Sequence, residues 1–411
     1  MIPKPLPRKW RLFNRTLLII LALLLIVQCS RCAFGNGDSK AIPSAKEDIE
    51  DSLPQREYEE NLILQQEKID LAHVYAQKDT GLAHLMDNML RRYHPDNALF
   101  LAVDAKTNEI LAWGERRDSA VQNSPDYLSQ ATFPAASLAK TVTIAAAFES
   151  NRYSVDSEIP LIGGAHTLYK NQIRVPQNYH GETIPLHMAY GKSYNPPMAI
   201  IGMNLGVKRL KNAAYKFGFN RDFPDGIPDR SSYEPPDTGY GLAEVASGFT
   251  KSTTLSPLQA AAIVRSIVEK KPLEIPFEKN GAYGYAPTER IDLPDSKFSN
   301  STYLGVREAM LTTAIKGTSR RHIMSTRNIS RRFLDDLDIG GKTGSLDGDN
   351  PKGRYDWFMG FAQGKIDPSK AIVIVVMQAH GEIRSQAASL VAAILINYWA
   401  RENLSIKGND K

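Results

Sequence analysis

Ser137 and Lys140 lie three residues apart in the segment PAASLAKTVTIAAAF (134–148), where almost every other side chain is small or apolar. A serine hydroxyl is a poor nucleophile unless a neighbouring base takes its proton. On a helix, positions i and i+3 share one face, so Lys140 would reach the hydroxyl of Ser137. Apolar surroundings lower the pKa of a lysine, which lets it act as that base. Alone the pair is weak evidence, because about one or two S-x-x-K matches are expected by chance in a chain of this length; an ordinary helical lysine is the alternative.

Two further motifs follow in the same order along the chain. The sequence SYN (193–195) is an S-x-N motif, although a turn before a helix explains it equally well on its own. The sequence KTG (342–344) lies on a predicted strand and is expected by chance in only about a tenth of such chains. Its alternative is a strand-edge lysine followed by a turn. The ordered set of three motifs is therefore stronger evidence than any one of them.

The set S-x-x-K, S-x-N and KTG resembles the signature of penicillin-binding proteins and serine β-lactamases. The likeness to the transpeptidase domain of penicillin-binding proteins covers roughly residues 83–399. It is carried by four longer segments: YHPDNALFLAVDAKTNEILAWG, NPPMAIIGMNLGVKRLKNAAYKFGF, GYGLAEVASGFTKSTTLSPLQAAAI and KTGSLDGDNPKGRYDWFMGFA.

The resemblance implies acyl transfer on a D-alanyl-D-alanine stem peptide. In this reading Ser137 attacks the penultimate carbonyl, Lys140 takes its proton, and Ser193 relays a proton to the leaving amine. β-Lactam antibiotics are then expected as covalent inhibitors. The resemblance implies that the substrate-binding residues are Asn195, Lys342, Thr343, Gly344 and Ser345.

These residues receive separate roles from the resemblance. Lys342 and Thr343 would bind the terminal carboxylate and keep the pKa of Lys140 low, since two nearby ammonium groups disfavour double protonation. The oxyanion would lie between the backbone N–H groups of Ser137 and Ser345. Asn195 would hold either the Lys140 side chain or the substrate amide, and Gly344 would leave room for the substrate backbone along the strand.

Local sequence patterns predict the elements that must position these residues. The pattern predicts helices over 57–77, 81–93, the segment around Ser137 to about 149, and 385–400, with Ser256 as the N-cap of another helix. It predicts a hairpin from strands 98–103 and 109–113, and three late strands at 337–345, 356–363 and 371–379. Strands from both ends of the chain with helices between them predict an α+β fold. With the resemblance, we expect an antiparallel five-stranded sheet flanked by helices, with an all-helical subdomain.

The N-terminal region differs in composition from the rest. Five basic residues precede residue 16, no acidic residue occurs before Asp38, and an apolar run extends over Leu17–Val27. This pattern favours an uncleaved signal anchor that crosses the bacterial cytoplasmic membrane once and places the catalytic domain outside; a cleaved signal peptide is the alternative. Cys29 and Cys32 at the end of the run are expected to have no catalytic role. The predicted segments are a tail and anchor (1–34), a spacer and lead-in helix (35–80), a transpeptidase domain (81–403) and a C-terminal tail (404–411).

Composition excludes several other classes of function. Hydrophobic residues make up 42% and charged residues 23% of the 411 residues, as in a folded soluble domain. The net charge of +5 is concentrated at the N-terminus, so no nucleic-acid-binding surface is expected. The eight histidines show no H-x-x-x-H spacing, and Asp347 and Asp349 are typical of a solvated turn. We therefore expect no metal and no cofactor.

Two other functions remain open at this level. A β-lactamase or D,D-carboxypeptidase would share the acylation step and use water as the acceptor. A β-lactam sensor or cell-wall scaffold would keep the pocket without turnover.

Only about 50 residues separate the apolar run from the first domain helix, which leaves no room for a glycosyltransferase module, so a glycosyltransferase would be a separate partner.

Overall fold

The computed structural model describes residues 73–76, 78–117, 127–279, 286–381 and 384–404, all within the compact unit Leu64–Lys411. The predicted tail, apolar run, spacer and most of the lead-in helix lie outside these residues, as does nearly all of the C-terminal tail. Within the described ranges, no helix combines the length and apolarity needed to cross a membrane. The segment boundaries given above therefore stay predictions.

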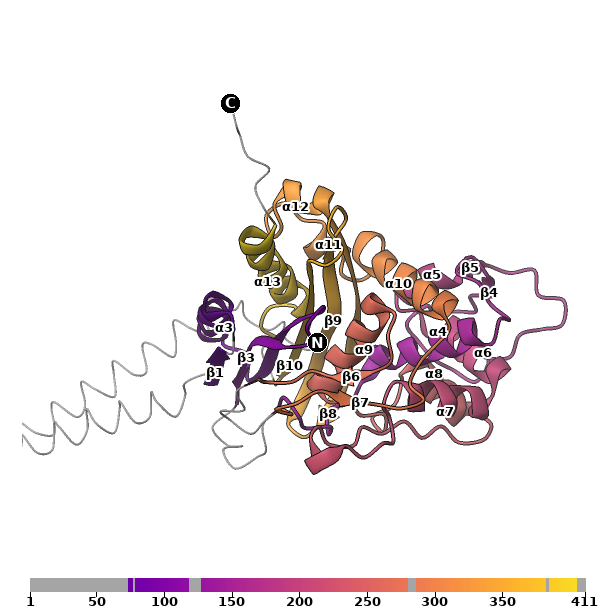
Figure 1. Ribbon diagram of the computed structural model, residues 1–411. Helices are drawn as coiled ribbons and strands as arrows, with labels where there is room; N and C mark the ends of the chain where they lie inside the picture. The colour runs from indigo at the N-terminus through magenta and orange to yellow at the C-terminus, as the bar shows by residue number, and fades with distance from the viewer. Residues whose placement is uncertain (1–72, 77, 118–126, 280–285, 382–383, 405–411) are drawn as a thin grey trace, which may run out of the picture. The chain divides into compact units, whose positions relative to one another are not determined.

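A six-stranded antiparallel sheet forms the centre of the described unit (Figure 1). Every pair of neighbouring strands is antiparallel, and the predicted hairpin and three late strands are all confirmed. In sheet order the strands are β1 (His73–Ala76), β3 (Ile110–Arg116), β2 (Asn97–Asp104), β10 (Ala371–His380), β9 (Lys352–Gly364) and β8 (Leu337–Asp349). Strand β8, which carries the KTG motif, is thus at an edge of the sheet.

The expected strand count of five is wrong by one, because β1 adds a sixth strand. Its four residues lie at the end of the predicted lead-in helix 57–77 but pair with β3, placing Tyr75 opposite Trp113. The two aromatic rings stack with their centroids 4.3 Å apart. Cross-strand aromatic contacts of this kind stabilise a short strand whose sequence alone carries little β signal.

Helices cover both faces of the sheet, because alternate strand residues point to opposite faces. On one face, residues such as Phe100 and Ile374 pack against α3 (Thr80–Tyr93) and α13 (Ala388–Asn403). On the other face, residues such as Leu101 and Val375 join the larger core, which contains several further helices (Figure 1). Among them are α4 (Lys140–Glu149), α9 (Pro257–Glu269) and α10 (Asn300–Ile315).

The predicted helical subdomain lies between β3 and β8 in the chain and is not purely helical. Its further helices include α5 (Leu186–Gly191), α6 (Asn195–Leu205), α7 (Val207–Lys216), α8 (Tyr240–Ser247) and the 3₁₀ turn η3 (Pro224–Gly226). It also contains a small hairpin of β4 (Glu158–Pro160) and β5 (Thr183–Pro185). The other short elements are β6 (Glu274–Ile275), β7 (Ile291–Asp292), α11 (Arg320–Ile323) and α12 (Arg331–Asp336).

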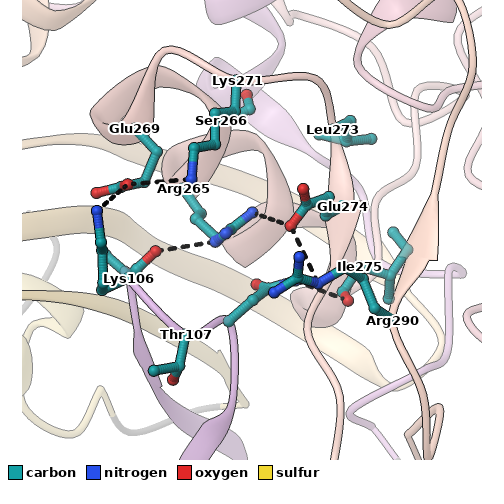
Figure 2. Close-up of polar contacts among 12 residues, drawn as sticks. Lys106, Thr107, Arg265, Ser266, Glu269, Lys271, Leu273, Glu274, Ile275 and Arg290 are labelled. Carbon is teal, nitrogen blue, oxygen red and sulfur yellow. Dashed lines mark hydrogen bonds and ion pairs between the residues drawn. The ribbon is translucent and has the colours of Figure 1, made fainter.

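Helix α9 joins the sheet to the rest of the fold through a buried arginine. As predicted, Ser256 caps this helix, accepting a hydrogen bond from the backbone N–H of Gln259. The Arg265 guanidinium is 1% exposed; it donates to the backbone oxygen of Ala105 and pairs with Glu274 at 2.6 Å. Figure 2 shows this arginine between β6 and the turn that connects β2 to β3. The contacts hold the hairpin turn and β6 against α9.

Candidate active site

Ser137 lies on a tight turn rather than inside the predicted α-helix. The turn is the 3₁₀ segment η2 (Ala136–Ala139), which leads directly into α4. Ala136 has φ 49°, a backbone conformation that L-residues seldom adopt. Such strain persists only where the surroundings enforce it, and here Gly248 packs so closely that a Cβ at this position would lie 2.1 Å from the Ala136 carbonyl oxygen. The turn therefore holds the serine in one fixed position.

Lys140 is fully buried at the start of α4, and three oxygen atoms surround its amine. The Lys140 Nζ lies 2.7 Å from Ser137 Oγ and 2.7 Å from Asn195 Oδ1, and it also contacts the backbone oxygen of Ser247. The amide and backbone oxygens can only accept hydrogen bonds, whereas the serine hydroxyl can also donate one. A neutral amine has two N–H groups and one lone pair. Two N–H bonds to Asn195 and Ser247 would therefore direct the lone pair at Ser137.

The environment of Lys140 favours this neutral form. Burial lowers the pKa of Lys140 well below its usual value of 10.5, and the charge of nearby Lys342 lowers it further. Burial disfavours the charged form because an ammonium loses its hydration, and a second cation adds repulsion. The apolar neighbours of the S-x-x-K segment thus favour the neutral amine, which is the form that can act as a base.

Asn195 has a fixed orientation at the start of α6. Its side-chain Nδ2 donates to the backbone oxygen of His166 at 2.8 Å, which turns Oδ1 toward Lys140. Of the two roles predicted for Asn195, this geometry matches the one in which it holds the lysine. His166 also contacts Tyr194 edge to face, with ring centroids 5.3 Å apart. The loop before β5 thereby helps to position the base.

Ser193 and Lys342 form a second serine–lysine pair beside the first. Ser193 has φ 59° in the turn between α5 and α6, and its backbone N–H donates to the Tyr190 oxygen. The Lys342 ammonium donates to Ser193 Oγ at 2.9 Å and to the Thr343 backbone oxygen at 2.7 Å. Burial lowers the pKa of Lys342 to about 7. Lys342 therefore changes charge close to neutral pH.

The KTG strand runs along the edge of the site. An edge strand presents backbone groups to which an extended peptide can pair. A Cβ at Gly344 would point at η2, 3.3 Å from both the Ala135 oxygen and the Ala136 Cβ. The glycine therefore lets β8 pack closely on the nucleophile turn, and its expected role in leaving room for the substrate backbone stays a prediction.

Three groups that complete the site were not predicted from the sequence. The carbonyl of Ser247 contacts Lys140, Gly248 supports η2, and the Thr318 hydroxyl lies 2.5 Å from that of Thr343. A backbone carbonyl has no sequence signature, and Thr318 belongs to no recognised motif. Gly248, which directly follows Ser247, is the one residue type among the three that could have indicated a close backbone approach.

A cavity of about 530 Å³ opens over these groups. Of the predicted site residues, six line it: Ser137, Ser193, Asn195, Thr343, Gly344 and Ser345. Lys140 and Lys342 are buried behind the two serines.

Across the described part of the chain, no cluster of three or more His, Cys, Asp or Glu side chains could hold a metal ion. Asp347 and Asp349 form surface ion pairs with Arg354 and Lys251.

The fold is shared with solved transpeptidase domains. The transpeptidase domain of penicillin-binding protein 3 from Burkholderia pseudomallei aligns over 81% of this chain and 98% of that structure, with a TM-score of 0.59 and 16% identity. Penicillin-binding protein A from M. tuberculosis, solved as a ceftriaxone acyl-enzyme complex, aligns over 81% and 80% with a TM-score of 0.57 and 17% identity. Both likenesses establish the architecture, which is the antiparallel α+β fold described above.

The family is also identified from the sequence. Residues 98–396 match the penicillin binding protein transpeptidase domain, and the chain belongs to this family. Stage V sporulation protein D of Bacillus subtilis is 24% identical over 348 residues, which are 78% of this chain and 51% of that protein. The peptidoglycan D,D-transpeptidase PbpA of Mycolicibacterium smegmatis is 21% identical over 69% of this chain and 57% of its own length. The chain thus spans only about half the length of the curated relatives that it matches.

Proposed function

We propose that this protein is a D,D-transpeptidase that cross-links peptidoglycan stem peptides through an acyl-enzyme on Ser137. The observation that carries the proposal is the buried Lys140 amine, which lies 2.7 Å from Ser137 Oγ and has two acceptor-only partners. Membership of the transpeptidase family and the names of its D,D-transpeptidase relatives support the substrate class.

The proposed reaction follows from the two serine–lysine pairs. Lys140 takes the hydroxyl proton of Ser137 as its oxygen attacks the carbonyl carbon of the penultimate D-alanine. The C–N bond then breaks, and the terminal D-alanine leaves as an amine that receives a proton through Ser193. The amine of a second stem peptide attacks the acyl-enzyme, forms the cross-link and restores the Ser137 hydroxyl.

The cationic form of Lys342, with the hydroxyls of Thr343 and Thr318, would receive the terminal carboxylate. An ion pair with a hydrogen bond is stronger than a neutral contact, which favours a substrate that ends in a carboxylate. The backbone N–H groups of Ser137 and Ser345 would hold the oxyanion. The site residues act through their own side chains and backbone, and the reaction as written needs no cofactor.

A labelled penicillin tests this proposal. We expect the protein to form a covalent adduct that persists for many minutes, and Ser137→Ala to form none. Thr253→Val, a buried change outside the cavity, is a control for general damage to the fold. Rapid loss of the adduct would indicate a β-lactamase instead, and a folded protein without an adduct would indicate a scaffold. Mass spectrometry of products from purified stem peptides distinguishes an amine acceptor from water.

We also propose that the apolar run Leu17–Val27 anchors the protein in the bacterial cytoplasmic membrane with the catalytic domain outside. The five basic residues before it support this arrangement. A separate glycosyltransferase would then supply the glycan strands. Extraction of the protein from membranes by detergent but not by high salt is the expected result. Release by salt alone would refute the anchor.

A further inference from the structure

Tyr190 is a fully buried tyrosine beside the second serine–lysine pair, and the proposed reaction does not use it. It lies on α5, three positions before Ser193 in the sequence. The Lys342 Nζ lies over its ring, 5.4 Å from the ring centroid. The face of an aromatic ring attracts a cation within about 6 Å, more strongly where water is excluded. The Lys342 ammonium therefore has an attractive neighbour besides its two oxygen partners.

The hydroxyl and the backbone of Tyr190 tie the same residue to both serine–lysine pairs. Its hydroxyl lies 3.0 Å from the hydroxyl of Thr141, which directly follows Lys140 on α4. Burial raises the pKa of the Tyr190 hydroxyl, so the ring stays neutral beside the lysines. Its backbone oxygen accepts from the Ser193 N–H at 2.9 Å. One residue thus contacts Lys342, Ser193 and the helix that begins with Lys140.

Lys342 is fully buried, and no carboxylate of the described residues forms an ion pair with it. Its amine donates to Ser193 Oγ and to the backbone oxygen of Thr343. Lys140 is the titratable neighbour on α4, since the charge of Lys342 lowers its pKa. A charge on Lys140 would in turn oppose the ammonium form of Lys342, as burial does. The two oxygens and the ring of Tyr190 are the groups that favour this form.

The carboxylates on neighbouring elements are directed elsewhere. Asp338 lies on the same face of β8 as Lys342, four residues away, and pairs with Arg307 of α10 at 2.9 Å. By register, the other aspartates of β8 and β9 lie on the opposite face of the sheet. These are Asp347, Asp349 and Asp356. The remaining carboxylates on the elements that pack against β8 are Glu308 on α10 and Asp335 and Asp336 on α12.

A neutral ring suits a cation that must also receive an anion. A carboxylate beside Lys342 would attract the ammonium more strongly, but it would also repel the terminal carboxylate of the substrate. The ring of Tyr190 attracts the ammonium without adding a negative charge. The positive charge of Lys342 is thereby supported without being neutralised.

We propose that Tyr190 is a positioning residue for carboxylate recognition, whose ring face keeps Lys342 charged and holds it at Ser193. The inference rests on the proposed function, in which Lys342 receives the terminal carboxylate. Without the ring, the buried ammonium would lose its proton at a lower pH. The ring face is the group that acts, so Tyr190→Phe keeps the role and Tyr190→Leu loses it.

Penicillin and its methyl ester test the proposal through acylation of Ser137. They share the reactive carbonyl, but only penicillin carries a carboxylate for Lys342. The measurement is the second-order rate of acylation of the full-length protein by each probe from about pH 5 to about pH 9, expressed as the acid-to-ester ratio. The ratio cancels the titration of Lys140, because both probes need the same base. In the wild type the ratio should fall as the pH rises through about 7.

Variants of Tyr190 locate the effect. Tyr190→Leu should move this fall to lower pH by about one unit, the size expected for a desolvated contact between a cation and a ring. Well above the wild-type midpoint, its acid-to-ester ratio should therefore be about 10-fold below that of the wild type. Tyr190→Phe should stay within about twofold of the wild type.

Two controls separate this effect from damage to the fold. Phe217→Leu removes a buried ring that does not line the cavity, and it should leave the ratio unchanged. Acylation by the ester confirms that each variant is folded with a reactive serine. If Tyr190→Leu does not fold, Tyr190→Met, which also lacks the ring, takes its place.

The outcomes separate this inference from the proposed function. If neither probe acylates Ser137 in the wild type, the proposed function fails, and the role of Tyr190 fails with it. If both probes react but Tyr190→Leu lowers the two rates equally, or the wild-type ratio does not change with pH, the inference alone is overturned. An equal shift in Tyr190→Phe and Tyr190→Leu would also overturn it, because the ring face would then not be the group that acts.

Discussion

Asn195→Asp is a nearly isosteric change that tests whether Lys140 is the base. It replaces one acceptor of the Lys140 amine with a carboxylate oxygen, 2.7 Å from Nζ. The carboxylate stabilises the ammonium form, so it raises the pKa of Lys140. The acylation rate falls at low pH, because only the neutral amine can take the Ser137 proton. This acid limb of the pH–rate profile should therefore move to higher pH in the variant.

The size of this shift follows from the distance. Two unit charges 2.7 Å apart attract by about 6 kcal/mol at an effective dielectric constant of about 20, which corresponds to about four pKa units. Burial of the new carboxylate opposes this attraction, since a buried charge loses hydration. If dehydration offsets two thirds of the attraction, the limb still moves by more than about one pH unit.

The assay is the second-order rate of acylation by a labelled penicillin between pH 5 and 10. At pH values on the acid limb the variant should react more than about 10-fold more slowly than the wild type, and it should recover at high pH. Asn204→Asp, an exposed change on α6, is the matched control and should not move the limb. A slower variant whose acid limb stays at the wild-type pH would refute Lys140 as the base.

Three further predictions concern other groups. Because the pKa of Lys342 is about 7, kcat/KM for a substrate with a terminal carboxylate should fall as the pH rises through about 7, whereas an amidated substrate should lack this limb. Gly248→Ala should slow acylation and lower the Tm, because its Cβ meets the Ala136 oxygen; Gly226→Ala has a similar φ and nothing within 4 Å, so it controls for backbone strain alone. Glu149 accepts hydrogen bonds from Lys216, Ser299 and Thr302, and its pKa is lowered to about 2. Its folded pKa lies below the ordinary value of 4.5, so the stabilisation is present above pH 4.5 and is lost as the pH falls toward 2. Glu149→Gln should therefore cost about 2 kcal/mol at pH 7, after allowance for solvent exposure, and the difference in denaturant midpoints should shrink below pH 4.5. A constant difference across this pH range would contradict the assigned role.

The strands and the motifs were predictable because both are local patterns. Continuous β-branched and apolar runs, such as AIVIVVMQA, predict buried strands, and these runs form β2, β9 and β10. The hairpin at 98–113 and the cap at Ser256 were likewise visible in short stretches. Strand β1 was not predicted, because its four residues follow a helical pattern and carry no strand pattern of their own. The contact that stabilises it, the stacking of Tyr75 on Trp113, joins two distant parts of the sequence.

The geometry of the site depends on contacts that join distant parts of the chain. Lys140 lies beside Ser137, as the i, i+3 spacing predicts, but α4 begins at the lysine and the serine lies on a 3₁₀ turn. Gly248, more than a hundred positions away in sequence, helps to enforce that turn. The orientation of Asn195 depends on the carbonyl of His166, and a carbonyl is present at every residue. Such three-dimensional contacts cannot be read from residue types.

The edge position of β8 has a consequence for self-association. An open strand edge that can pair with a peptide can also pair with the same strand of another molecule, which leads to aggregation. The end of β8 nearest the hairpin tip carries Asp347 and Asp349, and charged side chains at an edge oppose such pairing. The edge of β8 therefore combines two properties. Its backbone groups can pair with an extended peptide, while its charged side chains oppose pairing with β8 of a second molecule.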